Sequence, residues 1–102
     1  MDREQLIREF HEMWDTFPGM ARLITKKHEI LASNEAAISK GFITGEICAK
    51  VNSPQAHRGC LLAQTFLTGK GCFDRPSEHL IRGWLPVGDG KECVVHFSIT
   101  LE

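Results

Sequence analysis

The stretch HLIRGWLPVGDGKECVVHFSIT, residues 79–100, decides the fold class. Two runs rich in β-branched and aromatic residues flank residues 88–91, whose sequence Gly-Asp-Gly-Lys is typical of a hairpin turn. In the second run apolar residues alternate with a mixed set, so one face of that strand is apolar and the other is mixed. The sequence therefore predicts an antiparallel β-hairpin. His96 falls on the mixed face, where we expect exposure to solvent.

An amphipathic helix is predicted at the start of the chain, over residues 2–17. Asp2 is suited to cap its first turn, with Gln5 three residues later, and Pro18-Gly19 ends it. Large apolar residues recur at helical spacing and form a wide stripe, which consists of Leu6, Phe10, Met13, Trp14 and Phe17. The stripe either packs on the chain's own domain or forms a surface for dimerisation and signal transmission, and both interpretations stay open.

Short strands and helices are predicted between these two ends. Residues 22–25 and 29–32 are β-prone and flank a polar turn, as in a hairpin. Asn34 is suited to cap a short helix that ends at Gly41. Residues 72–77 are typical of an edge strand, because Pro76 cannot donate a hydrogen bond to a neighbouring strand.

A further helix is predicted to end at Gly69. On a helical wheel its core-facing arc consists of Cys60, Leu62, Ala63, Phe66 and Leu67. Gln64 and Thr65 fall outside that arc. One antiparallel sheet covered on one face by helices is the economical packing of all these parts, so the sequence predicts an α+β domain.

In this order, the predicted elements resemble a PAS domain, the small sensory module of bacterial signalling proteins. The resemblance covers nearly all of residues 18–100. ARLITKKHEILASNEAA (21–37) is similar to the family's first hairpin and first short helix, and GFITGEICAKV (41–51) to the next helical turns. LLAQTFLTGKG (61–71) resembles the long helix that closes the pocket, and residues 83–100 resemble the last hairpin.

The resemblance implies a five-stranded antiparallel sheet with short helices on one face and a ligand cavity between them. It implies a sensory input domain over residues 18–100, covalently attached to an output domain such as a histidine kinase or diguanylate cyclase. Residues 1–17 match the N-terminal helix through which such modules form homodimers and pass signals. Leu101-Glu102 resemble a cloning remnant, and we give them no role.

The expected ligand pocket combines the helical arc with apolar residues of the sheet. Its candidate lining residues are Ile43, Leu62, Phe66, Leu67, Trp84, Val95 and Phe97. The same residues are the expected hydrophobic core, so the sequence alone does not separate pocket from core.

A metal- or redox-responsive domain is the alternative function, because four soft ligands recur along the chain: Cys48, His57, Cys60 and Cys72. His57 and Cys60 are three positions apart, but the double Cys-x-x-Cys of a strong zinc site is absent, and free cysteines are commonly buried in cores. We expect no bound cofactor. A metal ion, or haem held by His57, stays open as an alternative, whereas flavin is not expected, because the Asn-Cys-Arg motif of light-sensing PAS domains is absent.

Composition and charge limit the other function classes. Twelve basic and 13 acidic residues give a formal net charge of -1, so neither a nucleic-acid-binding surface nor a membrane-binding patch is expected. There is no signal peptide or membrane-length apolar run, and we expect a cytoplasmic domain. No nucleophile motif, metal-hydrolase motif or phosphate loop occurs, so we do not expect an enzyme.

Overall fold

The computed structural model describes residues 2–51 and 59–101. Its helical elements are α1 (Arg3–Trp14), α2 (Glu35–Ile38), the 3-10 helix η1 (Cys48–Lys50) and α3 (Leu62–Thr68). Its strands are β1 (Met20–Thr25), β2 (Ile30–Ser33), β3 (Cys72–Ser77), β4 (Leu80–Val87) and β5 (Cys93–Thr100).

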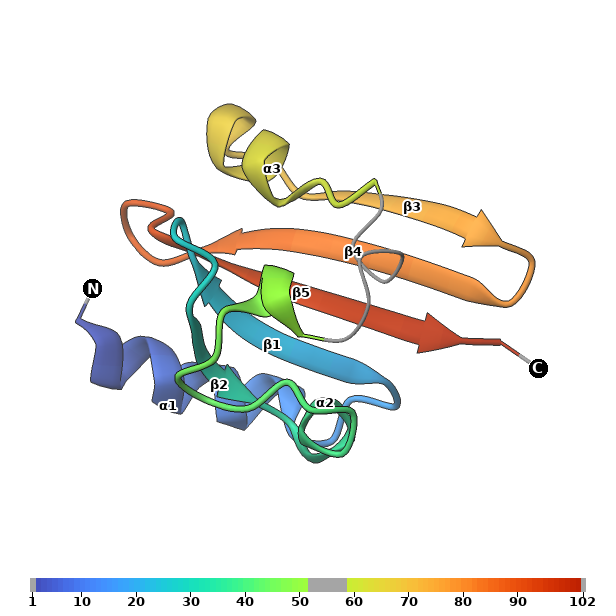
Figure 1. The fold of residues 1–102 in the computed structure, drawn as a ribbon. Coiled ribbons are helices and arrows are strands. Elements are labelled where there is room, and N and C mark those ends of the chain that lie inside the picture. The colour runs from blue at the N-terminus through green and yellow to red at the C-terminus, as the bar shows by residue number, and fades with distance from the viewer. Residues whose placement is uncertain (1, 52–58, 102) are drawn as a thin grey trace.

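The strands form a single five-stranded sheet in the order β2-β1-β5-β4-β3, and every neighbouring pair is antiparallel (Figure 1). The hairpin of residues 79–100 is the longest pairing, from Leu80 opposite Thr100 to Val87 opposite Cys93. In the turn, Gly88 has a φ of 95°, a conformation that glycine adopts without strain. The predicted α+β class and the five-stranded antiparallel sheet are therefore confirmed.

Helix α1 begins as the sequence predicts, because the Asp2 carboxylate accepts a hydrogen bond of 2.8 Å from the backbone N–H of Gln5. The helix ends at Trp14, earlier than the expected end at Phe17. A turn bond from the N–H of Phe17 to the carbonyl of Trp14 closes this end. The change of direction lets the chain enter β1 at Met20.

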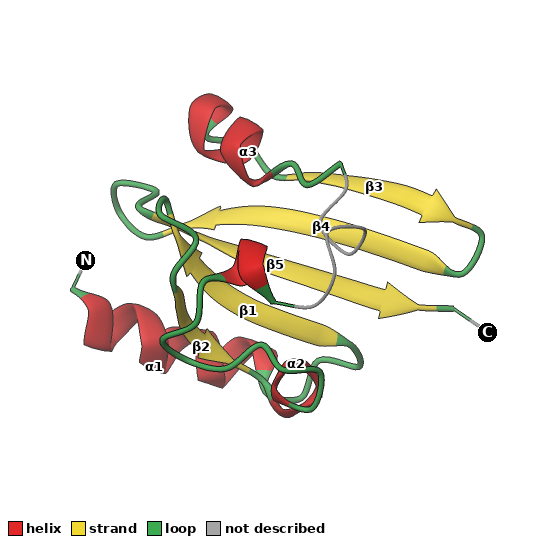
Figure 2. Ribbon diagram, in the orientation of Figure 1, coloured by secondary structure: helices red, strands yellow, loops and turns green. Residues whose placement is uncertain are grey.

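Helices cover both faces of the sheet: the short helices lie on one face, as predicted, and the N-terminal helix α1 lies on the other (Figures 1 and 2). The short elements α2, η1 and α3 pack on one face, around a core that includes Ile24, Ile30, Phe42, Leu62 and Trp84. Helix α1 packs on the opposite face, over β1 and β2, with a second core that includes Leu6, Phe10, Leu23, Cys93 and Val95. We call these the short-helix face and the α1 face.

The buried side of α3 differs from the predicted arc. Leu62 and Thr65 are buried, while Leu67 is 87% exposed. A threonine can face the core here because its hydroxyl donates a 2.8 Å hydrogen bond to the carbonyl of Leu61. The prediction that Thr65 lies outside the core-facing arc and Leu67 within it is wrong.

Candidate functional site

A row of five side chains crosses the short-helix face, one from each strand. Its members follow from the strand register: Ser33, Arg22, His96, Trp84 and Cys72, in order from β2 to β3. Directly paired residues of antiparallel strands point to the same face of a sheet. The row therefore places polar groups of Ser33, Arg22 and His96 on the face that the short helices cover.

At the centre of the row, the rings of Trp84 and His96 are stacked, with centroids 4.6 Å apart and planes 7° from parallel. Nδ1 of His96 lies 2.8 Å from the carbonyl oxygen of Gly83 and donates to it, since a carbonyl only accepts. His96 is buried, so the expectation that it is exposed is wrong. The mixed face of β5 is the one that the short helices cover.

Two adjacent cavities lie on this face and share His96 as a wall. The smaller, of about 190 Å³, is lined by Ile24, Leu62 and Trp84, by the thiol-bearing Cys48 and Cys60, and by His28. The larger, of about 240 Å³, lies on the other side of His96, over β1, β4 and β5. Its walls include Arg22, Lys40 and Arg82. Both volumes lie below the range of about 300–1,000 Å³ that is usual for pockets of drug-sized ligands.

The structure does not bring the seven pocket candidates together. Leu62 and Trp84 line the smaller cavity, and Phe66 packs against the same core. Val95 and Phe97 belong to the α1 face, because strand alternation turns them away from His96. Ile43 and Leu67 are exposed.

The structure describes three of the four candidate metal ligands. Cys48 and Cys60 line the same small cavity, whereas Cys72 lies against Thr65, with 3.2 Å between Sγ and Oγ1. His57 lies outside the described residues. Within residues 2–51 and 59–101, no group of three or more His, Cys, Asp or Glu side chains is arranged to hold a metal ion. Burial raises the pKa of the Cys48 thiol, although the nearby Arg22 opposes this effect.

The apolar stripe of α1 packs mostly on the chain's own sheet. Leu6 and Phe10 are buried in the core of the α1 face. Trp14 stacks on Phe97, with ring centroids 5.3 Å apart, and Phe17 meets Phe97 edge-on. Met13 is 71% exposed. Four of the five dimerisation candidates therefore contact their own domain, and Met13 faces solvent.

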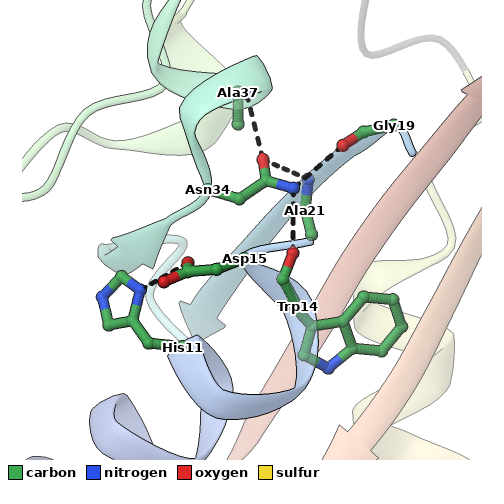
Figure 3. Close-up of polar contacts among 7 residues, drawn as sticks. All are labelled: His11, Trp14, Asp15, Gly19, Ala21, Asn34 and Ala37. Atoms are coloured by element: carbon green, nitrogen blue, oxygen red, sulfur yellow. Dashed lines mark hydrogen bonds and ion pairs between the residues drawn. The ribbon is translucent and has the colours of Figure 1, made fainter. Parts of the chain in front are cut away.

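Asn34 connects the two helical layers (Figure 3). Its Oδ1 accepts hydrogen bonds from the N–H groups of Ala21 and Ala37, both 3.1 Å long, and so caps α2 as the sequence predicts. Its Nδ2 donates to the carbonyls of Trp14, at 3.2 Å, and Gly19, at 2.9 Å. One buried amide thus holds the end of α1, the start of β1 and the start of α2.

Sequence reasoning found the capping role of Asn34 but missed its bonds to the end of α1, since they join residues far apart in the chain. It also missed Arg22, which is 4% exposed and lies with its guanidinium carbon 4.0 Å from the centre of the Phe42 ring. A charged residue between two apolar ones in a predicted strand was the available signal.

The fold of this chain resembles that of two solved structures. No family model and no curated protein sequence matches the chain. Among solved structures, a sensory box sensor histidine kinase from Vibrio cholerae superposes with a TM-score of 0.71 at 10% identity, over 97% of this chain and 89% of that one. The PAS domain from Bordetella pertussis BvgS superposes with a TM-score of 0.63 at 19% identity, over 96% of this chain and 86% of that one. The chain has the PAS fold.

The two likenesses confirm the predicted PAS domain at the level of fold. At 10% and 19% identity, the likeness to these two structures concerns the fold alone. In the part of the chain that the structure describes, no helix is both long and apolar enough to cross a lipid bilayer.

Proposed function

We propose that this PAS domain is the sensory input module of a larger bacterial signalling protein. A small ligand enters the cavities of the short-helix face, and the response passes through α1 to an attached output domain, such as a histidine kinase or diguanylate cyclase. Coupling of this kind requires that the ligand favour one of two arrangements of the same elements.

The observation that carries this proposal is the four-bonded amide of Asn34. The cavities lie on one face of the sheet and α1 lies on the other, so a signal has to pass through or around the sheet. Asn34 touches both sides, because it caps α2 on the short-helix face and holds the last carbonyl of α1. A displacement of α2 therefore changes the support of α1 directly.

The test compares two leucines of α3 by amide hydrogen exchange. Leu62 lines the smaller cavity, whereas Leu67 lies on the exposed side of the same helix. Leu62→Ala removes side-chain volume from the cavity wall, and Leu67→Ala makes the same chemical change in solvent. We expect Leu62→Ala to speed exchange in α1 by more than it speeds exchange in β4 and β5, and Leu67→Ala to leave α1 unchanged.

Adding Asn34→Ala to Leu62→Ala provides the control for the route. If Asn34 carries the coupling, the additional effect of Leu62→Ala on α1 disappears in this background. A Leu62→Ala response restricted to α3 and the strands beneath it contradicts the proposal.

We also propose that the domain forms a homodimer through the α1 face. Met13 is exposed there, and the uncovered part of this face carries the exposed Phe73 and Leu85. Phe73 is paired with Gly83 and Leu85 with Val95, so both side chains point to the side on which α1 lies. Exposed apolar side chains gathered on one face of a sheet mark an interaction surface.

A metal- or redox-responsive domain is the second candidate, supported by the shared cavity position of Cys48 and Cys60. Elemental analysis of protein purified without chelator tests it. Stoichiometric zinc or iron that is lost in Cys60→Ser would support this alternative, and metal-free protein with an intact fold would contradict its metal form.

A further inference from the structure

Three of the five residues in the cross-strand row have buried polar atoms with no hydrogen-bond partner among the described residues. These atoms are Nε and Nη1 of Arg22, Oγ of Ser33 and Nε1 of Trp84. Buried polar groups in folded proteins are nearly always paired, so each exception requires an explanation, such as a bound water or ion. Ser33 and Arg22 are direct neighbours in the row, and Trp84 follows on the far side of His96.

Arg22 is the most costly of these exceptions, because it carries a full charge. Its side chain is 4% exposed, and the guanidinium stacks on the ring of Phe42. Arg22 has no ion pair with a carboxylate in the described part of the chain.

The larger cavity, which Arg22 lines, is cationic. Lys40 and Arg82 also line it, and no carboxylate of the described residues does. Arg82 is neutralised by Asp74, whose two oxygens lie 2.9 Å from Nε and 2.5 Å from Nη2. The charges of Arg22 and Lys40 remain, in a chain whose formal net charge is -1.

The remaining walls are apolar and belong to Met20, Phe42 and Leu80. A bare inorganic anion in a cavity of about 240 Å³ would leave these surfaces unfilled. A carboxylate on a short hydrocarbon chain matches both the cationic and the apolar walls of the cavity. Its oxygens accept hydrogen bonds from the N–H groups of Arg22, and its carbons contact the apolar side chains.

We propose that the cavity between Arg22, Lys40 and Phe42 binds a small organic carboxylate as the ligand of this sensory domain. This inference rests on the proposed function, and it names the chemical class of the ligand. The carboxylate supplies the counter-charge that Arg22 lacks, which ties occupancy of the cavity to the position of β1. Phe42 follows α2 in the chain, and Arg22 belongs to β1. The same ligand would therefore contact both segments that the Asn34 side chain joins, β1 and the segment that contains α2.

The test is a titration monitored on the two described methionine methyl groups. Met20 lines the cavity, and Met13 lies exposed on the opposite face, so one protein sample labelled with ¹³C-methyl methionine contains both reporter and control. Sodium propionate and sodium succinate are the probes, propionamide is the uncharged counterpart, and sodium phosphate is the inorganic anion. Ionic strength is held constant with sodium chloride.

We expect propionate or succinate to shift the Met20 methyl signal in a saturable manner, with Met13 unmoved and propionamide at least tenfold weaker. Arg22→Met should weaken binding at least tenfold, because it removes the charge and keeps an unbranched stem over Phe42. Arg8→Met, which removes an exposed arginine of α1, should bind as the natural sequence does. If Arg22→Met does not fold, Lys40→Met should still weaken binding several-fold.

Equal binding of propionate and propionamide, full binding by Arg22→Met or Lys40→Met, or a response to phosphate without one to either carboxylate overturns the inference. The absence of any saturable carboxylate response overturns it as well. None of these results decides whether the domain is sensory. That proposal is tested separately by hydrogen exchange in α1 of Leu62→Ala, which does not depend on the charge of the ligand.

Discussion

Gly83 of β4 packs against the tip of the aromatic ring of Phe97 on β5, and a Cβ atom on Gly83 would collide with Cζ, Cε1 and Cε2 of that ring. Trp14 stacks on the same ring, and Phe17 meets it edge-on. The end of α1 is thus fixed to the sheet by an aromatic cluster that only a glycine at this position accommodates.

Gly83→Ala should therefore lower the free energy of unfolding by about 2–3 kcal/mol, the usual cost of forcing atoms into a filled core. Chemical denaturation followed by tryptophan fluorescence measures it. Gly90→Ala is the matched control, because its nearest neighbour would be a Glu92 oxygen at 3.8 Å, and its effect should be within about 0.5 kcal/mol. Equal stability of the two variants would show that the Phe97 ring moves aside freely.

Two substitutions separate the roles of Asn34. Asn34→Ala removes all four hydrogen bonds and should cost about 2–4 kcal/mol, which combines the loss of a helix cap with buried groups left unpaired. Asn34→Asp keeps an acceptor for Ala21 and Ala37 but has no donor for the carbonyls of Trp14 and Gly19. We expect its α2 to stay protected from hydrogen exchange while the last turn of α1 opens.

Ser39→Ala is the control for Asn34, since Ser39 bonds the carbonyl of Ala36 at the exposed end of α2. It should change stability by less than about 0.5 kcal/mol. Uniform loss of protection over α1 and α2 in Asn34→Asp would refute the division of roles.

Two buried thiols should make the domain less stable in alkali. Burial raises the pKa of Cys48 and of Cys93, and the charge of Glu92 adds to the effect at Cys93. Above about pH 8.5 the unfolded chain releases these protons while the folded chain retains them, so the free energy of unfolding falls as the pH rises. Denaturation series between pH 7 and 10 measure the slope.

Cys93→Ala should flatten the alkaline part of that profile, whatever its effect on absolute stability. Ser39→Ala, at the exposed end of α2, is the control and should leave the slope unchanged. An alkaline slope that is the same in Cys93→Ala as in the natural sequence would contradict this prediction.

Met13→Glu combined with Phe73→Glu should convert the proposed homodimer into a monomer. Both side chains are more than two-thirds exposed, at 71% and 73%, so the charges should not disturb the folded domain. Sedimentation velocity measures the mass, and circular dichroism checks the fold. Leu67→Glu, on the exposed side of α3, is the control and should stay dimeric. The proposal fails if the unmodified domain sediments as a monomer at high concentration.

The elements themselves could be predicted from local patterns, and their positions in space could not. The alternation in β5 and the cap at Asn34 each depend on a few neighbouring residues, and both predictions are confirmed. The apolar stripe of α1 requires a covering partner, yet nothing in the stripe says which face of the sheet supplies it. The same limit applies to His96 and Arg22, because alternation separates two faces without saying that the more polar one is also covered.

Thr65 shows a different limit. A helical wheel places the Thr65 hydroxyl on the solvent side. In the structure this hydroxyl donates a hydrogen bond to the backbone carbonyl one turn earlier, so burying it costs little free energy. Arg22 was overlooked for the opposite reason. Its Nε and Nη1 have no hydrogen-bond partner in the described chain. Rules based on local sequence assume that the protein itself supplies a partner for every buried polar group.

The alternation of β1 has a consequence for how this domain tolerates sequence change. Leu23 supports α1, while its neighbours Arg22 and Ile24 face the cavities, so one stretch of backbone serves as the wall of both layers. Side chains that never meet, such as Phe10 and Phe42, therefore depend on the position of the same strand. The effects on stability of two substitutions, one in each layer, should therefore be strongly non-additive. Sequence changes in one layer should be accompanied, during evolution, by compensating changes in the other.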